Sequence, residues 1–148
     1  MVTLNKIMDA FKAFGTANVF ITHYATGQPS DMDDLKESQF PLMFVVYEGA
    51  TYNVNVKSYS FEVLLVGNTS QLNQVDESVQ MVSDMEQVGE DLLADIIAGH
   101  TYFAFDSQYE MTSATNTPIV EQQRNILTGS SLRLSIDVPF NANSCIQP

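Results

Sequence analysis

The side chains that could support metal binding or catalysis are few and far apart in this chain. The two histidines, His23 and His100, have no second histidine or glutamate at the spacing of a zinc motif, so a loop or core role explains each better. The cluster Asp31, Asp33 and Asp34 resembles a calcium loop only loosely, because the DxDxDG spacing and the closing glutamate are missing. A solvated loop is the simpler interpretation of these three carboxylates.

Motifs for nucleophilic or phosphate chemistry are also missing. The sequence contains no GxSxG, GxGxxG or GxxxxGK segment, and its seven glycines form no phosphate-binding loop. Cys145 is the only cysteine, so neither an intrachain disulfide nor a cysteine-based metal site can form. A Ser–His–carboxylate triad stays open, since its members can lie far apart in the sequence. We therefore expect no catalytic, cofactor-binding or metal site, and a protein that is not an enzyme.

The charge of the chain limits its partners. Asp and Glu number 18 against six Lys and Arg, which gives a formal net charge of −12. DNA, RNA and anionic lipid bind clustered basic residues, and the six here are scattered. We therefore expect no sequence-specific nucleic-acid binding and no membrane binding. An acidic surface would, however, let DNA slide past without adhering.

Length and hydrophobicity predict one folded domain over residues 1–148. The chain is 45% hydrophobic and long enough to bury a real core. No apolar run approaches the ~20 residues that cross a bilayer. The first fifteen residues lack the charged start and apolar run of a signal peptide, so we expect a cytoplasm-like compartment or export within a larger assembly.

The spacing of apolar residues predicts an α+β fold. A helical spacing of three and four marks a short N-terminal helix and a long helix of about six turns from Val75 to Ile96. Alternating or continuous apolar runs predict strands at Leu42–Glu48, Tyr59–Val66, Tyr102–Met111 and Ser131–Val138. This order favours a mostly antiparallel sheet with the long helix and the short N-terminal helix packed on one face.

Three further segments look like contact surfaces. A β-hairpin arm is expected at about residues 49–58, and a bulge or turn near Lys57–Ser58 would explain why the alternation changes parity there. The polar insert Thr112–Gln123 and an extended tail at about residues 141–148 are long for simple loops, although ordinary flexible loops are the alternative. Arms and tails of this kind add strands to neighbouring subunits. We expect the subunit interface to include Tyr52, Val54, Val56, Phe140 and Asn141.

Taken in order, these segments resemble the tail-completion or tail-terminator proteins of tailed bacteriophages. The resemblance covers most of the chain and consists of the order and texture of the elements, with no single diagnostic motif. It is carried by the N-terminal helix, the run Phe40–Val45, the strand Tyr59–Val66, the long helix with Val82-Ser83-Asp84 and Glu90–Leu93, and the ending Leu132–Asn141.

The resemblance implies a structural virion protein of the tail or neck, assembled in the host cytoplasm. Such a protein forms a ring at the head–tail junction, with a hexamer favoured and a dodecamer as the alternative. The ring would contact portal, connector and tail proteins and let DNA pass through its lumen. Another tail-tube or baseplate component and a cytoplasmic protein-binding module are the competing hypotheses.

Overall fold

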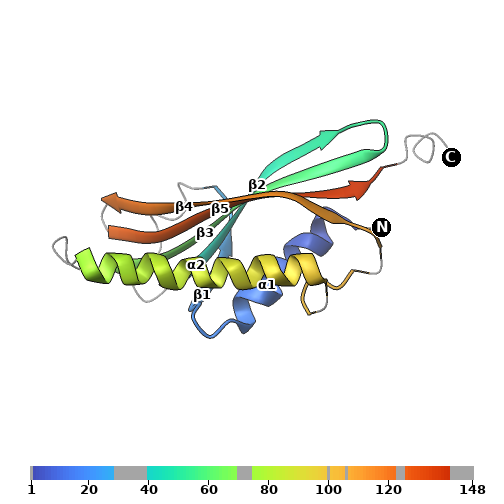
Figure 1. Cartoon of the computed structure of the whole chain (residues 1–148). Coiled ribbons are helices and arrows are strands. Elements are labelled where there is room, and N and C mark those ends of the chain that lie inside the picture. Colours follow the sequence, from blue (N-terminus) through green and yellow to red (C-terminus); the bar gives the residue numbers. More distant parts are fainter. Residues whose placement is uncertain are drawn as a thin grey trace.

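Two helices and five strands make up the computed structural model, which describes residues 2–28, 40–69, 75–99, 101–105, 107–122 and 126–140 (Figure 1). In chain order they are α1 (Leu4–Ala17), β1 (His23–Thr26), β2 (Leu42–Tyr52), β3 (Val56–Thr69), α2 (Val75–Ala98), β4 (Glu110–Gln122) and β5 (Ile126–Pro139). The strands form one sheet in the order β1-β2-β3-β5-β4. Only β1 and β2 pair in parallel, so the predicted α+β class with a mostly antiparallel sheet is confirmed.

Helix α1 has clear start and stop signals. Thr3 caps its first turn, because the side-chain oxygen accepts a hydrogen bond from the Lys6 N–H. At the other end the Asn18 N–H still donates to the Phe14 carbonyl, and the chain then turns extended. The buried stripe of the helix includes Phe11, whose ring meets both Phe61 and Phe103 edge-on at a centroid distance of 5.1 Å. These contacts fix α1 against the sheet.

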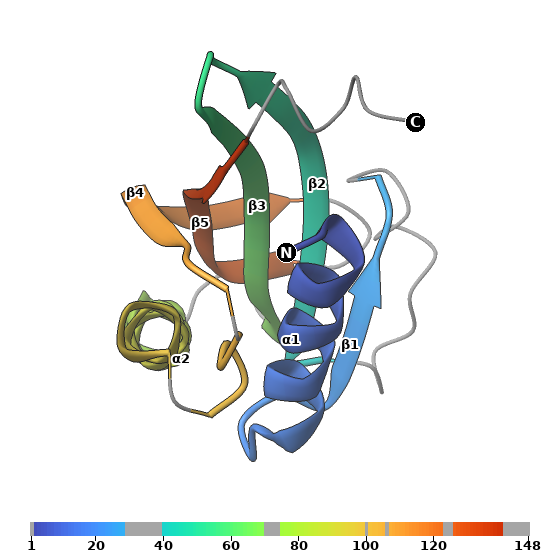
Figure 2. The same ribbon diagram turned by 90° about the vertical axis from the view of Figure 1, so that its right-hand side faces the viewer.

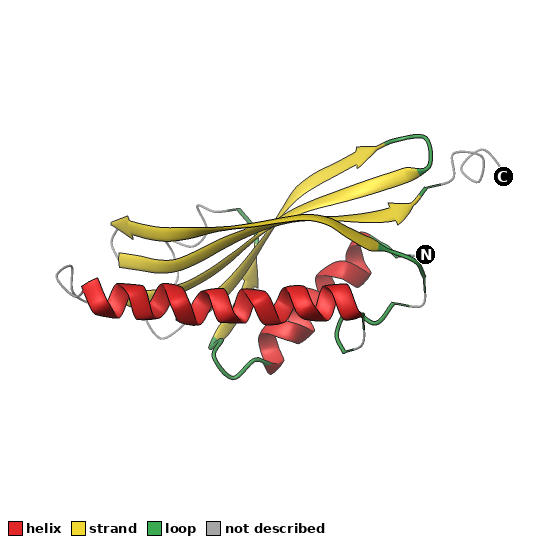
Figure 3. Ribbon diagram, viewed as in Figure 1, coloured by secondary structure: helices red, strands yellow, loops and turns green. Residues whose placement is uncertain are grey.

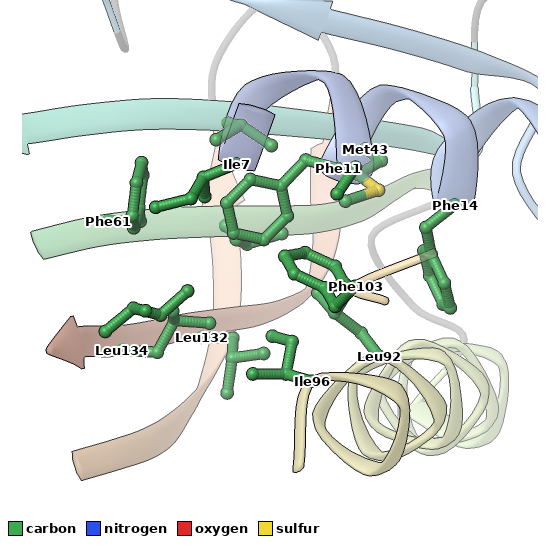
Figure 4. Packing of buried hydrophobic residues seen from close by; sticks show 14 of the residues in the cluster. Ile7, Phe11, Phe14, Met43, Phe61, Leu92, Ile96, Phe103, Leu132 and Leu134 are labelled. Carbon is green, nitrogen blue, oxygen red and sulfur yellow. The ribbon is translucent and has the colours of Figure 1, made fainter. Parts of the chain in front are cut away.

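Helix α2 also buries one apolar face, over a greater length. Its buried side chains advance by three and four residues and join those of α1 and the sheet in one core: Met85, Val88, Leu92 and Ile96. Figure 4 shows side chains of this core converging from α1, α2 and the strands. In Figures 1 and 3 both helices lie below the sheet, and Figure 2 shows α1 beside β1 and β2 with α2 at the β4–β5 side.

The opposite face of the sheet carries a second, smaller apolar cluster. It is made of side chains from β2 and β3 that are at most 7% exposed: Leu42, Phe44, Val46, Leu64 and Val66. The central strands are therefore buried on both faces. This explains why Leu42–Glu48 reads as a continuous apolar run instead of an alternating one.

Two sequence predictions were wrong in detail. The register shift lies on β2 between Tyr47 and Gly49, and β3 continues through Lys57–Ser58 with unbroken pairing to β5. Residues Tyr102–Tyr109 are irregular where the structure describes them, and the polar insert Thr112–Gln123 belongs to β4 as far as Gln122. The side chains at 112–118 are exposed on both faces of this edge strand, so no apolar alternation reveals it.

Candidate assembly surface

The most prominent exposed feature is the distal half of the β2–β3 hairpin. Strand β1 pairs with β2 only at Leu42–Val45, so beyond that point β2 contacts just one described strand, β3. The hairpin closes where the Asn53 N–H donates to the Val56 carbonyl at 2.8 Å. In Figure 1 this end of the hairpin extends beyond both helices. We call the segment from Gly49 to Lys57 the arm.

The structure brings some of the predicted interface residues together on the arm. The ring of Tyr52, which is 56% exposed, meets the ring of Phe140 edge-on at 5.3 Å. The Phe140 N–H also donates to the Asn55 carbonyl at 2.9 Å, which ties the end of β5 to the turn of the arm. Val54 lies in that turn and is 79% exposed, whereas Val56 is half-buried opposite Pro139. Asn141 lies outside the described residues.

Lys57 completes this surface, although no sequence pattern singled it out. Its Nζ lies 4.4 Å from the centroid of the Tyr59 ring and 5.2 Å from that of Tyr52, which is cation–π geometry. Hydrogen bonding to the Tyr59 side chain is the main cause that raises the pKa of Lys57. The two rings border a hollow of about 370 Å³ that is also lined by Val2, Thr3, Pro139 and Phe140. The surface therefore offers aromatic rings and one positive charge.

A second exposed surface lies at the opposite edge of the sheet, along β4. Strand β4 pairs only with β5 among the described strands, so its far edge presents free backbone groups. Every side chain from Thr112 to Pro118 is exposed, and no charged residue occurs between Glu110 and Glu121. Natural edge strands are protected from pairing by charges, prolines or bulges. This edge lacks such charges over most of its length.

The link between α2 and β4 is held by a buried carboxylate. Asp95 is 7% exposed, and its side-chain oxygens accept hydrogen bonds from three consecutive amides: those of Thr101 at 3.2 Å, Tyr102 at 2.9 Å and Phe103 at 3.0 Å. The Tyr109 hydroxyl is a hydrogen-bond donor to two carbonyl oxygens, that of Ile96 at 2.6 Å and that of Phe103 at 2.7 Å. Burial is the main cause that raises the pKa of Tyr109. These bonds set the position from which β4 begins.

The other residues with chemical potential do not form a recognisable centre. His23 is a half-buried residue of β1. His100, Cys145 and the cluster Asp31–Asp34 lie outside the described residues. Within the described ranges, no group of three or more His, Cys, Asp or Glu side chains is arranged to hold a metal ion. The same part of the chain contains no helix that is long and apolar enough to span a membrane.

Comparison with known proteins adds no assignment. No protein-family model matches the chain, and its sequence has no significant match among curated proteins.

Proposed function

We propose that this protein is a structural subunit of a ring at the head–tail junction of a tailed bacteriophage. The ring terminates the tail or joins it to the head and lets DNA pass through its centre. The protein acts through its surfaces and not as an enzyme. The proposal builds on the resemblance of most of the chain to tail-completion proteins, with the helices packed on one face of the sheet.

One observation supports the proposal above the others: the chain exposes two different surfaces, the arm and the open edge of β4, on opposite edges of one sheet. A ring needs such a pair, because each subunit must present one surface to the preceding copy and another to the following copy. The arm exposes Tyr52 and Val54, and β4 exposes an uncharged edge. A twofold dimer would need only one self-complementary surface.

The distribution of charge is compatible with the passage of DNA. Asp84, Glu90 and Asp91 are exposed on α2. The two aspartates are held in place by Gln80 and Gln87, which donate hydrogen bonds to them at 2.9 and 3.2 Å. A helix face of this kind in the lumen of a ring repels the phosphate backbone, so DNA is not trapped.

Two of the described cations interact with side chains of the same fold. The Arg133 Nε lies 2.8 Å from a carboxylate oxygen of Glu62 on the neighbouring strand. Lys57 packs over two tyrosine rings. We infer that the partners of the ring are proteins, namely portal, connector and tail subunits, and that DNA passes without being bound.

Native mass spectrometry and negative-stain microscopy of the purified protein test this function. We expect rings, with six copies favoured over twelve. Val54→Asp should shift the protein towards smaller species, because it places a charge in the proposed contact. Val19→Asp is the matched control, since Val19 is 91% exposed in the α1–β1 connection, away from the arm. A wild-type protein that stays monomeric at tens of micromolar and binds no virion protein would overturn the proposal.

A further inference from the structure

We propose that the ring closes by strand addition, in which Ser113–Thr117 of β4 in one copy pairs antiparallel with Gly49–Tyr52 of β2 in the next. The inference rests on the proposed ring function and names the partner of each edge. It follows from the direction in which backbone groups point across the sheet. That direction can be traced strand by strand from the hydrogen bonds and registers.

The hydrogen bonds between β1 and β2 define this direction for β2. The carbonyls of Pro41 and Val45 accept hydrogen bonds from the N–H groups of Thr22 and Gly27. Odd-numbered residues in this part of β2 therefore face β1, and even-numbered residues such as Phe44 face β3. Phe44 pairs with Leu64, so even-numbered residues of β3 face β2 and odd-numbered ones face β5.

Across β5 the alternation continues to the open edge of β4. Leu65 pairs with Ser130, so the even-numbered residues of β5 face β3 and the odd-numbered ones face β4. Ser131 in turn pairs with Thr117, so Thr117 faces β5. The backbone groups that point away from β5 are therefore those of Ala114, Asn116 and Pro118.

The position of Pro118 agrees with this outward direction and limits the length of β4 that can pair. A proline has no N–H, so within a sheet it is tolerated where that position faces outward. Its place on the open edge costs β4 no bond to β5, but it removes a donor for any added strand. The register shift between Met111 and Ser113 limits the edge at its other end. A strand can therefore add along Ser113–Thr117, where Ala114 and Asn116 offer both donor and acceptor.

The arm contains the complementary segment. Gly49 pairs with Ser60 and Thr51 with Ser58, and even-numbered residues of β3 face β2. Gly49 and Thr51 therefore face β3, which leaves the backbone groups of Ala50 and Tyr52 facing outward. This segment is limited by the bulge before Gly49 and by the turn after Tyr52. It too offers two residues with free donors and acceptors.

Direction and sidedness of the two segments agree. Along β2-β3-β5-β4 every pairing is antiparallel, so β4 runs opposite to β2 and remains so when copies are related by rotation about an axis along the strands. Asn116 lies on the same sheet face as Leu132 of the main core, and Ala50 on the same face as Tyr59. Pairing the two segments therefore keeps the helices of all copies on one side of a continuous sheet.

Charge also selects these segments. Two copies that each carry a net charge of −12 repel one another at most approaches. Neither segment contains a charged residue: the nearest are Glu48 and Lys57 around the arm segment, and Glu110 and Glu121 around the other. Here the copies can approach with little like-charge repulsion. The register that uses all outward groups pairs Ala50 with Asn116 and Tyr52 with Ala114, which makes four hydrogen bonds and places Thr51 opposite Thr115.

Disulfide trapping tests the register. In a Cys145→Ser background, Thr51→Cys and Thr115→Cys would occupy a non-hydrogen-bonded pair with Cα atoms about 4.5 Å apart, within the range of about 4.4–6.8 Å that disulfides span. We expect oxidation to link neighbouring copies into ladders on a denaturing gel. Thr51→Cys with Thr117→Cys is the matched control, because the two positions are diagonal, about 7–8 Å apart. Links formed only by the control pair would overturn the register, and links by neither pair would overturn the strand addition.

A proline substitution tests the backbone bonds independently. Asn116→Pro removes a donor from the open edge without removing a bond to β5, as Pro118 already does, whereas Asn116→Ala changes the side chain and keeps the donor. We expect Asn116→Pro to abolish the ring by native mass spectrometry, Asn116→Ala to preserve it, and both to keep the wild-type circular dichroism spectrum. A ring that survives Asn116→Pro and gives no Thr51–Thr115 link would overturn this inference and leave the proposed function standing. A wild-type monomer would overturn both.

Discussion

Asp95→Asn should destabilise the protein more than its small change in shape suggests. The carboxylate of Asp95 accepts the amides of Thr101, Tyr102 and Phe103, of which that of Phe103 is fully buried. Asparagine keeps the size of the side chain but replaces one acceptor oxygen with an NH₂ group, which cannot accept. The remaining oxygen can take the place of the one that accepts from Tyr102 and Phe103, so the NH₂ group faces the Thr101 N–H and the two other bonds become neutral instead of charge-assisted.

The size of the effect follows from the exposure of these amides. Thr101 is exposed, so water can replace its bond, and the loss falls on the amides of Tyr102 and Phe103. A hydrogen bond to a charged group contributes about 1.5–3 kcal/mol and a neutral one about 0.5–1.5 kcal/mol, so the two bonds together lose about 2–3 kcal/mol. For a domain of 148 residues this corresponds to a drop in Tm of about 5–10 °C.

Urea unfolding followed by far-ultraviolet circular dichroism measures this loss. Asp91→Asn is the matched control, because Asp91 is exposed one turn earlier on α2 and accepts a single bond from Gln87. We expect the control to stay within about 0.5 kcal/mol of wild type. If Asp95→Asn unfolded at the same urea concentration as the control, the carboxylate would not hold the 101–103 segment. Hydrogen exchange at these three amides would show whether the segment itself is released.

Two further predictions concern packing and ionisation. Gly89→Ala should stabilise α2 by about 0.5–1 kcal/mol, because the added methyl meets Leu65 Cδ1 at 3.4 Å and Leu132 Cδ2 at 3.8 Å, both ordinary contact distances. Gly129→Ala should destabilise the protein by several kcal/mol, because its methyl would collide with the Leu65 carbonyl. Equal urea midpoints for the two variants would contradict this. Burial, and secondly Asp9, raises the pKa of Tyr24 from 10.0 to about 12. Unfolded Tyr24 ionises first, so its contribution to stability is lost as the pH rises from about 10 towards about 12. Tyr24→Phe should lose less stability over that range in alkaline urea titrations, and an unchanged pH dependence would contradict the assignment.

Much of the fold was predictable because most elements have one clearly buried face. The three-and-four spacing of Met85, Val88, Leu92 and Ile96 marks α2 in the sequence as clearly as in the structure. The alternation of β5 and the apolar run of β2 likewise follow from burial on one face and on both faces. Where burial sets the pattern, sequence periodicity is a sufficient guide.

The 101–122 region was not predictable on that basis. Phe103 and Phe105 alternate as in a strand, yet the segment is a loop whose amides and carbonyls are bonded by the Asp95 carboxylate and the Tyr109 hydroxyl. Asp95 and Tyr109 supply these bonds from six to eight residues away, and the apolar alternation of Phe103 and Phe105 does not reveal them. Strand β4 was not predicted for the opposite reason. Its pairing with β5 is continuous from Ser113 to Gln122, but both of its faces are exposed through Pro118, so no residue type is selected for burial.

The two proposed contact surfaces differ in how far the sequence indicates them. An exposed arm can be anticipated from Tyr52 and Val54, because large apolar residues outside the core periodicity suggest contact. The edge of β4 carries no such mark, since its proposed contacts are backbone groups that every residue except proline provides. Along that edge the pairing ends where a proline removes the outward N–H, as at Pro118. In a strand-addition assembly, proline and bulge positions therefore carry the information that apolar residues carry in a packed interface.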